Sequence, residues 1–515
     1  MTEDLTRRGL FGLAGASAAS AAGLGLGACT PSPPSVRTIQ AADSSSGPPF
    51  VSRPDLTPPR ITVRRHVVPS DPRYIFLNGP YSGPGHGGSY IVDTHGELVW
   101  LGPNTAAHHR MNFSVQTYNG RPALTWFQGL IVEGFGKGEL VIADSSYKIL
   151  HTIRPVQGEL ADFHEFVVTP PGTQGSKLGT ALITIYRAHS NVDLRAVRGP
   201  ANGHLLSGVA QEIDIATGKL LFEWDSWART NPPVPLTETY QKLGVRDGGH
   251  GTASSPYNYF HINSIAEVGD GTGDLLISGR NTWTVYRVKR TTGHIVWRLN
   301  GKRSDFTMGP RSKFFWQHHV RPHSNGRLAV FDNGGLPAEE RNSRAIVLYV
   351  NTKTKRVFLQ KAYIHPRQTY LAGAMGSAQL LRDGRMFVGW GTEPHFSEFA
   401  ADGRLLLDAD IIKGAPSYRA FTENWTGHPA DLPAVAARHR TGGATVYASW
   451  NGATEVRSWT VFAGKTKTSL ARVGAARKTG FETAIAVGSK GPYFAVHALD
   501  AKGKVLKKSA PVKIG

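Results

Sequence analysis

Short apolar runs, broken every few residues by turn formers, follow one another along most of the chain. Stretches with the helical period of about 3.6 residues are scarce by comparison. Glycine occurs 59 times and proline 32 times among the 515 residues, and many of these residues separate the apolar runs. Apolar runs bounded in this way are typical of strands joined by turns, so the pattern predicts an all-β fold.

A turn with a small or polar residue, followed by an apolar strand, recurs six times between about residues 70 and 425. The copies are DTHGELVWLG (93–102), DSSYKILHTI (144–153), DIATGKLLFEW (214–224), KRTTGHIVWRL (289–299), NTKTKRVFLQ (351–360) and AADGRLLLDA (400–409). Repeats of this kind are typical of the outer strands of β-propeller blades.

A second theme, two apolar strands joined by a turn, falls between these copies. It occurs at 111–129, 162–188, 259–281, 317–334 and 375–391. A further blade would combine RYIFLNG near residue 73 with SYRAFTENW (417–425), which would close the ring and protect its edges. The two themes together predict a six-bladed β-propeller over residues 55–430.

Residues 431–515 change in character, with alternating strands and turns roughly every ten residues. They resemble a small fibronectin type III or immunoglobulin-like β-sandwich. Extra propeller strands are the alternative, which a completed count of six blades makes less attractive. The predicted fold class is therefore all-β, a six-bladed β-propeller followed by a small β-sandwich.

The first 29 residues read as a targeting segment. TRRGLFG (6–12) places twin arginines before an Ala/Gly/Leu-rich run that ends in LGAC (26–29), which resembles a lipoprotein box. A transmembrane anchor fits this weakly apolar run less well. We expect export by the twin-arginine route, lipidation of Cys29 and an extracytoplasmic protein anchored to the membrane by lipid. Residues 30–54, rich in Pro and Ser, would be the tether.

Cys29 is the one cysteine of the sequence, so no intrachain disulfide is expected. The formal net charge is +20, from 58 basic and 38 acidic residues. Nucleic acid is one partner of basic proteins, but no dense basic run interleaved with aromatic residues is present. We expect no nucleic-acid partner and instead contact with an anionic cell envelope or wall polymer, together with attraction of anionic substrates.

The stretch YFHINSI (259–265) carries a histidine and an asparagine in an apolar strand. His164, His261 and His318 hold the same place in three successive repeats, so their side chains should converge in the central channel. A buried cluster of imidazoles without partners is poorly explained by packing. Arg187 and Arg280 end the second strands of two repeats, where a surface ion pair is the alternative role.

Eight fragments stand in the order seen in arylsulfotransferases: DFHEF, FHINSI, LLISGRN, IVWRL, QHH, VFDNG, MGSAQLL and SYRA. Residues 55–430 thus resemble the secreted six-bladed propellers of that family. The resemblance implies transfer of a sulfuryl group from a phenolic sulfate ester to a phenol acceptor, with a transient sulfohistidine and no cofactor. It identifies His318 as the nucleophile. His261, Asn263, Arg280 and His164 would bind the sulfate and phenolic oxygens.

The chemistry of these residue types agrees with that reading. Neutral imidazole is a competent nucleophile, and sulfuryl transfer, like phosphoryl transfer, needs donors aimed at the equatorial oxygens. His319 follows the proposed nucleophile, and either histidine could react. Strand alternation favours His318. His319, Arg187 and Asn333 are predicted substrate contacts, and Trp126, Tyr186 and Trp390 either face an aromatic ring or pack between blades.

Two alternatives remain at this stage. Three histidines on one ring could hold zinc or copper, although Arg280 would lie close to the cation, and we predict no metal. The propeller could also be non-catalytic and bind envelope glycans or a protein partner.

Overall fold

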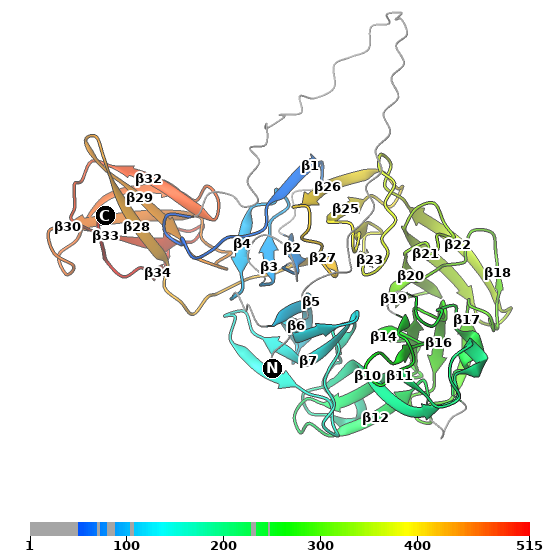
Figure 1. Ribbon diagram of the computed structural model, residues 1–515. Helices are drawn as coiled ribbons and strands as arrows, with labels where there is room; N and C mark the ends of the chain where they lie inside the picture. Colours follow the sequence, from blue (N-terminus) through cyan, green and yellow to red (C-terminus); the bar gives the residue numbers. More distant parts are fainter. Residues whose placement is uncertain (1–49, 69–72, 80–87, 104–107, 228–232, 246–247) are drawn as a thin grey trace, which may run out of the picture. The chain divides into compact units, whose positions relative to one another are not determined.

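The computed structural model describes residues 50–68, 73–79, 88–103, 108–227, 233–245 and 248–515 (Figure 1). The predicted signal, Cys29 and residues 30–49 of the tether lie outside the described residues. The regular elements of the described part are strands and three single 3-10 turns, at Thr173–Gly175, Arg195–Val197 and Leu236–Glu238. The predicted all-β class is confirmed. No helix in these ranges has the length and apolar character needed to cross a membrane.

Six antiparallel sheets are arranged in a ring (Figure 1). Their first strands contact one another in sequence around the centre. These inner strands are β5 (His109–Tyr118), β9 (Phe166–Val168), β14 (Ile262–Glu267), β19 (His318–His323), β23 (Ser377–Leu380) and β27 (Ala420–Asn424). The ring is the predicted six-bladed propeller, and the inner strands line its channel.

The six repeats predicted as outer strands overlap the fourth strands of the six sheets, three of which extend one to three residues beyond the repeat. These are β4 (Leu98–Leu101), β8 (Ile149–Ile153), β12 (Leu220–Asp225), β17 (Ile295–Leu299), β22 (Arg356–Tyr363) and β26 (Leu405–Ile411). Because each copy begins with a polar turn and continues into apolar residues, it places a strand at a fixed point of every blade.

Two middle strands complete each blade. The second strands are β2 (Arg73–Leu77), β6 (Arg121–Val132), β10 (Thr180–Val192), β15 (Leu275–Gly279), β20 (Arg327–Asp332) and β24 (Met386–Gly389). The third strands are β3 (Tyr90–Val92), β7 (Phe135–Ala143), β11 (Gly203–Asp214), β16 (Thr284–Val288), β21 (Arg344–Asn351) and β25 (His395–Phe399). Three short strands extend individual blades, namely β1 (Ile61–His66), β13 (Tyr257–Asn258) and β18 (Thr307–Met308).

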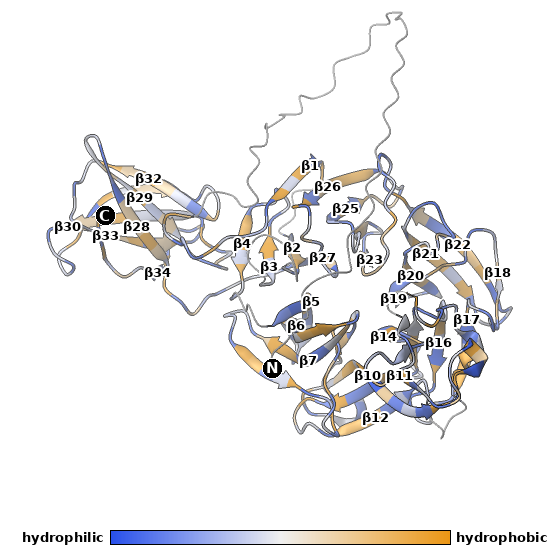
Figure 2. Ribbon diagram, in the orientation of Figure 1, coloured by the Kyte–Doolittle hydropathy of each residue, from blue (hydrophilic) through white to orange (hydrophobic). Residues whose placement is uncertain are grey.

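Apolar side chains cover both faces of the blades, because each blade packs between two others. One such layer joins Phe127 and Leu140 of one sheet to Ile183 and Val209 of the next. Figure 2 shows apolar residues on the strands of all the blades. This burial on two faces explains why many strands read as continuous apolar runs rather than as alternating ones.

The ring closes between the two ends of the propeller sequence. β27 pairs with β2, and Phe421 lies opposite Phe76 in the register. The blade predicted from RYIFLNG and SYRAFTENW therefore forms, with its inner strand supplied from the far end of the sequence. Closure of this kind joins the two ends of the propeller sequence in one sheet and leaves only short edges at the channel.

Residues after β27 form two further sheets. One contains β28 (Ala434–Arg440), β29 (Gly443–Ser449) and β32 (Glu482–Val487). The other contains β30 (Ser458–Gly464), β31 (Ala471–Arg477), β33 (Tyr493–Leu499), β34 (Val505–Lys508) and β35 (Val512–Lys513). A shared core with Trp459, Val446 and Val496 makes this the predicted β-sandwich. The boundaries placed at residues 30, 55 and 431, and the fibronectin likeness, stay predictions.

Candidate active site

Three histidines lie together where the inner strands of three blades begin. His164 precedes β9 by two residues, His261 directly precedes β14, and His318 is the first residue of β19. The ring centroid of His164 is 4.9 Å from that of His261 and 6.5 Å from that of His318. All three side chains are buried. The positions within the blades are similar rather than identical, because a bulge follows Ile262 and another follows His318.

Hydrogen bonds fix the tautomer of His318. The Asn333 amide nitrogen donates to the carbonyl oxygens of Ala372 and Met375, so its Oδ1 faces His318. Nδ1 of His318 lies 2.7 Å from that oxygen and 3.0 Å from the carbonyl oxygen of Trp316. Both neighbours of Nδ1 are acceptors, so Nδ1 carries the proton and Nε2 keeps its lone pair. The backbone N–H of Met375 donates to Nε2 at 3.2 Å.

His261 has the opposite tautomer. The amide nitrogen of Asn258 donates to its Nδ1 at 2.8 Å, and Asn258 is itself held by a bond from Asn281 to its carbonyl oxygen. With Nδ1 accepting, the proton of neutral His261 lies on Nε2. His261 can therefore donate a hydrogen bond to a bound oxygen.

His164 differs from both because its partner is a carboxylate. Its Nδ1 donates to Oδ2 of Asp162 at 2.8 Å. The Thr184 hydroxyl donates to the same oxygen, and the N–H of Gly136 donates to Oδ1. The imidazole also stacks on Phe163 with centroids 4.2 Å apart. The carboxylate keeps Nδ1 of His164 as a donor, so Nε2 is the nitrogen left to exchange a proton with a substrate oxygen.

Arg280 supplies fixed positive charge to the cluster. Its guanidinium lies 4.5 Å from the ring centre of Trp316, and its Nε donates to Asn281. Burial, and then the Arg280 charge, hold the pKa of His318 well below its ordinary value of 6.5. The same two causes lower the pKa of His261 in the same way. Both imidazole rings therefore remain uncharged even at acidic pH. A nucleophile and a neutral hydrogen-bond donor both require this uncharged form.

Left-handed backbone conformations gather at this cluster. His261, Trp316, His319 and Met375 have φ between 49° and 66°. Such values are uncommon outside glycine and cost about 1–3 kcal/mol each. Gly376 follows Met375 with φ 103°, and a Cβ there would meet the Phe331 ring at 2.3 Å. The strained turn at Met375 and Gly376 carries the N–H that reaches His318.

A match of the sequence with a known family decides what the cluster belongs to. The family model described as Arylsulfotransferase (ASST) matches residues 114–412, more than half of the chain, including the three histidines and Arg280. The chain belongs to the arylsulfotransferase family. The suspected resemblance is confirmed, and membership supports an arylsulfotransferase-like activity on phenolic substrates in general terms.

No curated protein matches the chain. A Bacteroides caccae protein of unknown function aligns at 12% identity and TM-score 0.38, over 68% of this chain and 99% of its own. Virginiamycin B lyase from Staphylococcus aureus aligns at 9% identity and TM-score 0.28, over 68% of this chain and 100% of its own. A GH43 protein from Bacillus licheniformis aligns at 9% identity and TM-score 0.30, over 79% of this chain and 89% of its own. Likenesses this distant carry no argument about function.

Several residues predicted to touch substrate have other contacts in this arylsulfotransferase-family structure. The amide nitrogen of Asn263 uses one of its two N–H groups to donate to the carbonyl oxygen of Gln317 at 2.6 Å. Both polar atoms of the Asn333 amide are used to hold His318 and the turn before β23. Asn333 is therefore placed to position the histidine rather than to contact a substrate.

His319 and Arg187 lie outside the histidine cluster. Nδ1 of His319 contacts the backbone of Ala378, and its ring packs near Phe421. Arg187 forms ion pairs with three carboxylates, those of Glu159, Glu223 and Asp225. This ion-pair role was the alternative weighed for Arg187, and these carboxylates already take up its charge.

Of the three aromatic residues considered, Tyr186 lies at the cluster. Its ring centroid is 5.5 Å from that of His261, and its hydroxyl donates to the carbonyl oxygen of Ile262. Trp126 and Trp390 are buried in packing layers between blades. Packing was the role favoured for all three.

Sequence reasoning missed four residues that organise the site, namely Asp162, Asn258, Glu165 and Arg419. Two of them stand in the motif DFHEF and one in SYRA, so the signal was polar residues flanking the histidine or starting an inner strand. Arg419 bonds Glu165 from 254 positions away, a contact that no local pattern contains.

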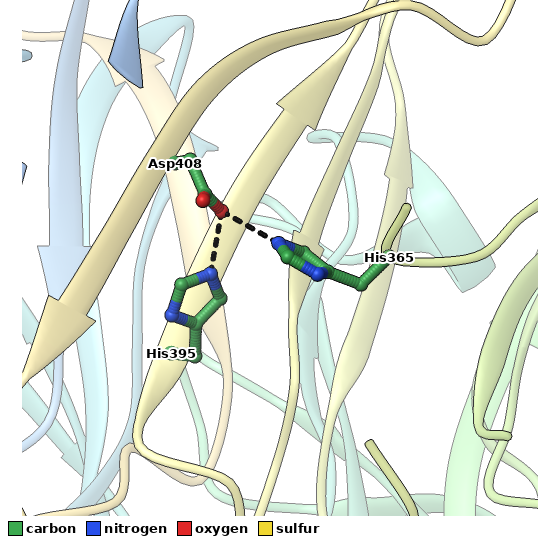
Figure 3. A group of neighbouring side chains, drawn as sticks. All are labelled: His365, His395 and Asp408. Atoms are coloured by element: carbon green, nitrogen blue, oxygen red, sulfur yellow. Dashed lines mark hydrogen bonds and ion pairs between the residues drawn. The ribbon is translucent and has the colours of Figure 1, made fainter. Parts of the chain in front are cut away.

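A metal-like group lies elsewhere, in the blade of β24, β25 and β26. Figure 3 shows His365 and His395 pointing at one oxygen of Asp408, at 3.0 and 2.6 Å. Nδ1 of His365 accepts the N–H of Gln368, so its Nε2 carries a proton and donates to Asp408. Both nitrogens of His395 face carboxylates, those of Asp408 and Asp410. These protonated nitrogens do not fit metal ligation, and the group is an ion-pair network.

Proposed function

We propose that this protein transfers a sulfuryl group from an aryl sulfate ester to a phenol, with His318 as the group that becomes sulfurylated. The observation that carries this proposal is the fixed tautomer of His318, with its proton held on Nδ1 by Asn333 and its lone pair on Nε2. A nucleophile needs its lone pair directed and its proton elsewhere, and the hydrogen bonds provide both.

In the first step, Nε2 of His318 gives up the hydrogen bond from the N–H of Met375, and its lone pair attacks sulfur and forms an N–S bond. The bond from sulfur to the aryl oxygen breaks, and its electron pair stays on that oxygen. His164 gives the oxygen its Nε2 proton, and Asp162 keeps hold of Nδ1. Arg280 and the Nε2–H of His261 stabilise charge on the sulfuryl oxygens.

The second step reverses the first with a new oxygen. An acceptor phenol attacks sulfur while its proton passes to Nε2 of His164. The N–S bond breaks, and its electron pair returns to Nε2 of His318. No atom or electron is gained from outside, which is consistent with a reaction that needs no cofactor.

Mass spectrometry after exposure to an aryl sulfate ester tests the proposal. The wild type should gain one sulfuryl group on a peptide containing His318, and adding phenol should remove it. His318→Ala should abolish both phenol release and labelling, whereas His319→Ala, the matched neighbour, should retain labelling. Labelling of His319 in the wild type, or unchanged transfer by His318→Ala, contradicts the assignment.

We also propose that the protein acts outside the cytoplasm, anchored through Cys29 and close to an anionic wall polymer. The support is the sequence of residues 1–29 and the net charge of +20. Cys29→Ala should move the protein from the membrane fraction to the soluble fraction without changing its specific activity. Retention of the variant on membranes would argue against the lipid anchor.

A further inference from the structure

The channel holds a cavity of about 300 Å³ whose lining does not include the three clustered histidines. β19 begins at His318 in the cluster and ends at His323, which lines this cavity. Side chains of β5, β23 and β27 line it as well. The cavity therefore occupies the part of the channel toward which the inner strands run.

Two arginines share one carboxylate at this cavity. Arg419 and Arg321 both line it, and both donate to Glu165, at 3.0 and 2.7 Å. Burial raises the pKa of Glu165, but the two guanidinium groups lower it by more, so the net pKa lies below its ordinary value. The carboxylate is therefore ionised. Two positive charges against one negative charge leave a surplus of positive charge in a buried place.

Two buried nitrogen atoms at the cavity remain without hydrogen-bond partners in the described residues. Nε of Arg419 is buried and makes no hydrogen bond, although the arginine side chain is completely enclosed. Nε2 of His323 is likewise buried and unbonded. An unpartnered buried donor costs about 1–3 kcal/mol unless a ligand or solvent meets it.

The remaining carboxylate at the cavity is Glu423 of β27, which accepts a hydrogen bond from Gln379. Burial raises the pKa of Glu423 to about 7. Its negative charge is therefore incomplete at neutral pH and absent at acidic pH, where the positive surplus is largest.

We propose that this cavity is a binding site for a small inorganic oxyanion, with sulfate as its test ligand. An oxyanion presents several oxygens, each of which can accept from a donor on a different inner strand, and a guanidinium can bind two of them at once. It would also offset the surplus charge of Arg321 and Arg419. The proposal does not require sulfuryl transfer at His318, because the lining of the cavity includes neither the three clustered histidines nor Arg280.

Titration calorimetry with sodium sulfate tests the site. Arg321→Gln removes one charge from the cavity and should weaken sulfate binding by about tenfold or more. Arg280→Gln, which changes the histidine cluster instead, should leave binding at the cavity in place. Binding that is lost in Arg280→Gln but unchanged in folded Arg321→Gln would place sulfate at the histidines and overturn the proposal.

A second variant keeps the test valid if Arg321→Gln fails to fold. Glu423→Gln removes a negative charge with little change of shape and should tighten sulfate binding above pH 7. Crystals soaked in selenate should show anomalous scattering between Arg321 and Arg419. Selenate found solely at Arg280, or unchanged affinity in Glu423→Gln at alkaline pH, would contradict the site.

Discussion

Each channel histidine is defined by the partner of its Nδ1. An amide oxygen holds the proton of His318 on Nδ1, and an amide nitrogen keeps the proton of His261 off Nδ1. A carboxylate accepts the Nδ1 proton of His164. Three identical side chains thereby become nucleophile, neutral donor and acid-base group. The asparagines and the aspartate are as necessary to this division as the histidines.

Removing the amide of Asn333 should impair the nucleophile without removing it. Asn333→Ala frees the ring of His318 to rotate and to take the other tautomer, and a wrong tautomer costs on the order of 100-fold to 10,000-fold in rate. We expect kcat for aryl sulfate turnover to fall by about that much while KM changes little. Steady-state kinetics with a chromogenic aryl sulfate would measure both.

Asn300→Ala is the matched control for that experiment. The amide nitrogen of Asn300 is also buried between two carbonyl oxygens, those of Trp283 and Phe314, but its partners are not histidines. It should lower the melting temperature to a similar extent and keep kcat. Equal losses of kcat in both variants would mean that Asn333 acts through stability alone.

The position of the acid limb of the pH–rate profile should depend on the charge of Arg280. Because that charge disfavours a protonated His318 and so lowers its pKa, Arg280→Gln should raise the pKa of His318. The acid limb of kcat/KM should then move to higher pH, whatever happens to the maximal rate. Arg187→Gln, which alters a distant carboxylate cluster, should leave the limb in place. An unmoved limb in Arg280→Gln would contradict the electrostatic role.

At the scale of elements, β27 does two things at once. It is the inner strand that closes the ring against β2, and it brings Arg419 into the channel. The N–H groups of Ala420 and Thr422 donate to Ser377 and Gln379 of the adjacent blade. By alternation, the N–H of Phe421 faces β2.

Phe421→Pro should therefore open the ring. It removes both a ladder hydrogen bond to β2 and a buried aromatic ring, and proline is poorly tolerated inside a sheet. Phe421→Leu, which keeps the backbone bond, should cost less than about 1.5 kcal/mol. Urea unfolding followed by tryptophan fluorescence would compare the two. Similar losses in both variants would show that the side chain, rather than closure, carries the stability.

The ion-pair network of β25 and β26 should make stability depend on pH. Burial lowers the pKa of His395, but Asp408 and Asp410 together raise it above 6.5, and the histidines in turn lower the pKa of Asp408. The histidine contribution is present below its ordinary pKa and lost as pH rises through the raised value. The aspartate contribution is present above about pH 4 and lost as pH falls.

His395→Gln should accordingly be most destabilising near pH 5 to 6, roughly between the two ordinary pKa ranges. The difference in melting temperature from the wild type should narrow toward alkaline pH and toward strong acid. A difference that is constant from pH 4 to 9 would mean that the imidazole contributes packing alone.

The local sequence pattern was enough to predict the strands, but it could not predict the contacts between blades. Polar turns followed by apolar runs placed all six fourth strands, and RYIFLNG with SYRAFTENW gave the closure. The family resemblance predicted that Asn263 binds a sulfate oxygen, but it could not show the bond of Asn263 to Gln317, or the left-handed backbone at His261 and the bulge after Ile262 that interrupt the strand alternation there. The bonds of Arg419 to Glu165 join residues 254 positions apart and follow from ring closure alone.

At the scale of the whole molecule, positive charge is concentrated toward one end of the sequence. Residues 431–515 carry 14 Lys and Arg against four Asp and Glu. Lys465, Lys467, Lys502 and Lys504 are exposed. Such a surface attracts polyanions, and the attraction is screened by salt over about 10 Å at 0.1 M.

Binding of the protein to a soluble polyphosphate should weaken steeply as salt rises from about 0.05 to 0.5 M. Replacing the four exposed lysines by glutamine should reduce affinity at low salt and flatten the salt dependence, while aryl sulfate turnover stays unchanged. Equal affinity of the wild type and the four-lysine variant would show that the polyanion does not bind at these lysines of the sandwich.

The late position of β27 in the sequence also sets a time order. A nascent chain can complete five sheets while the sixth lacks its inner strand, and until residue 424 emerges the channel has neither a wall at β27 nor the Arg419 charge. Pairing of β27 with β2 then closes the ring and brings the Arg419 charge into the channel in the same step. Catalysis should therefore appear abruptly, at the end of folding, and a chain released too early would be open and inactive rather than partly active.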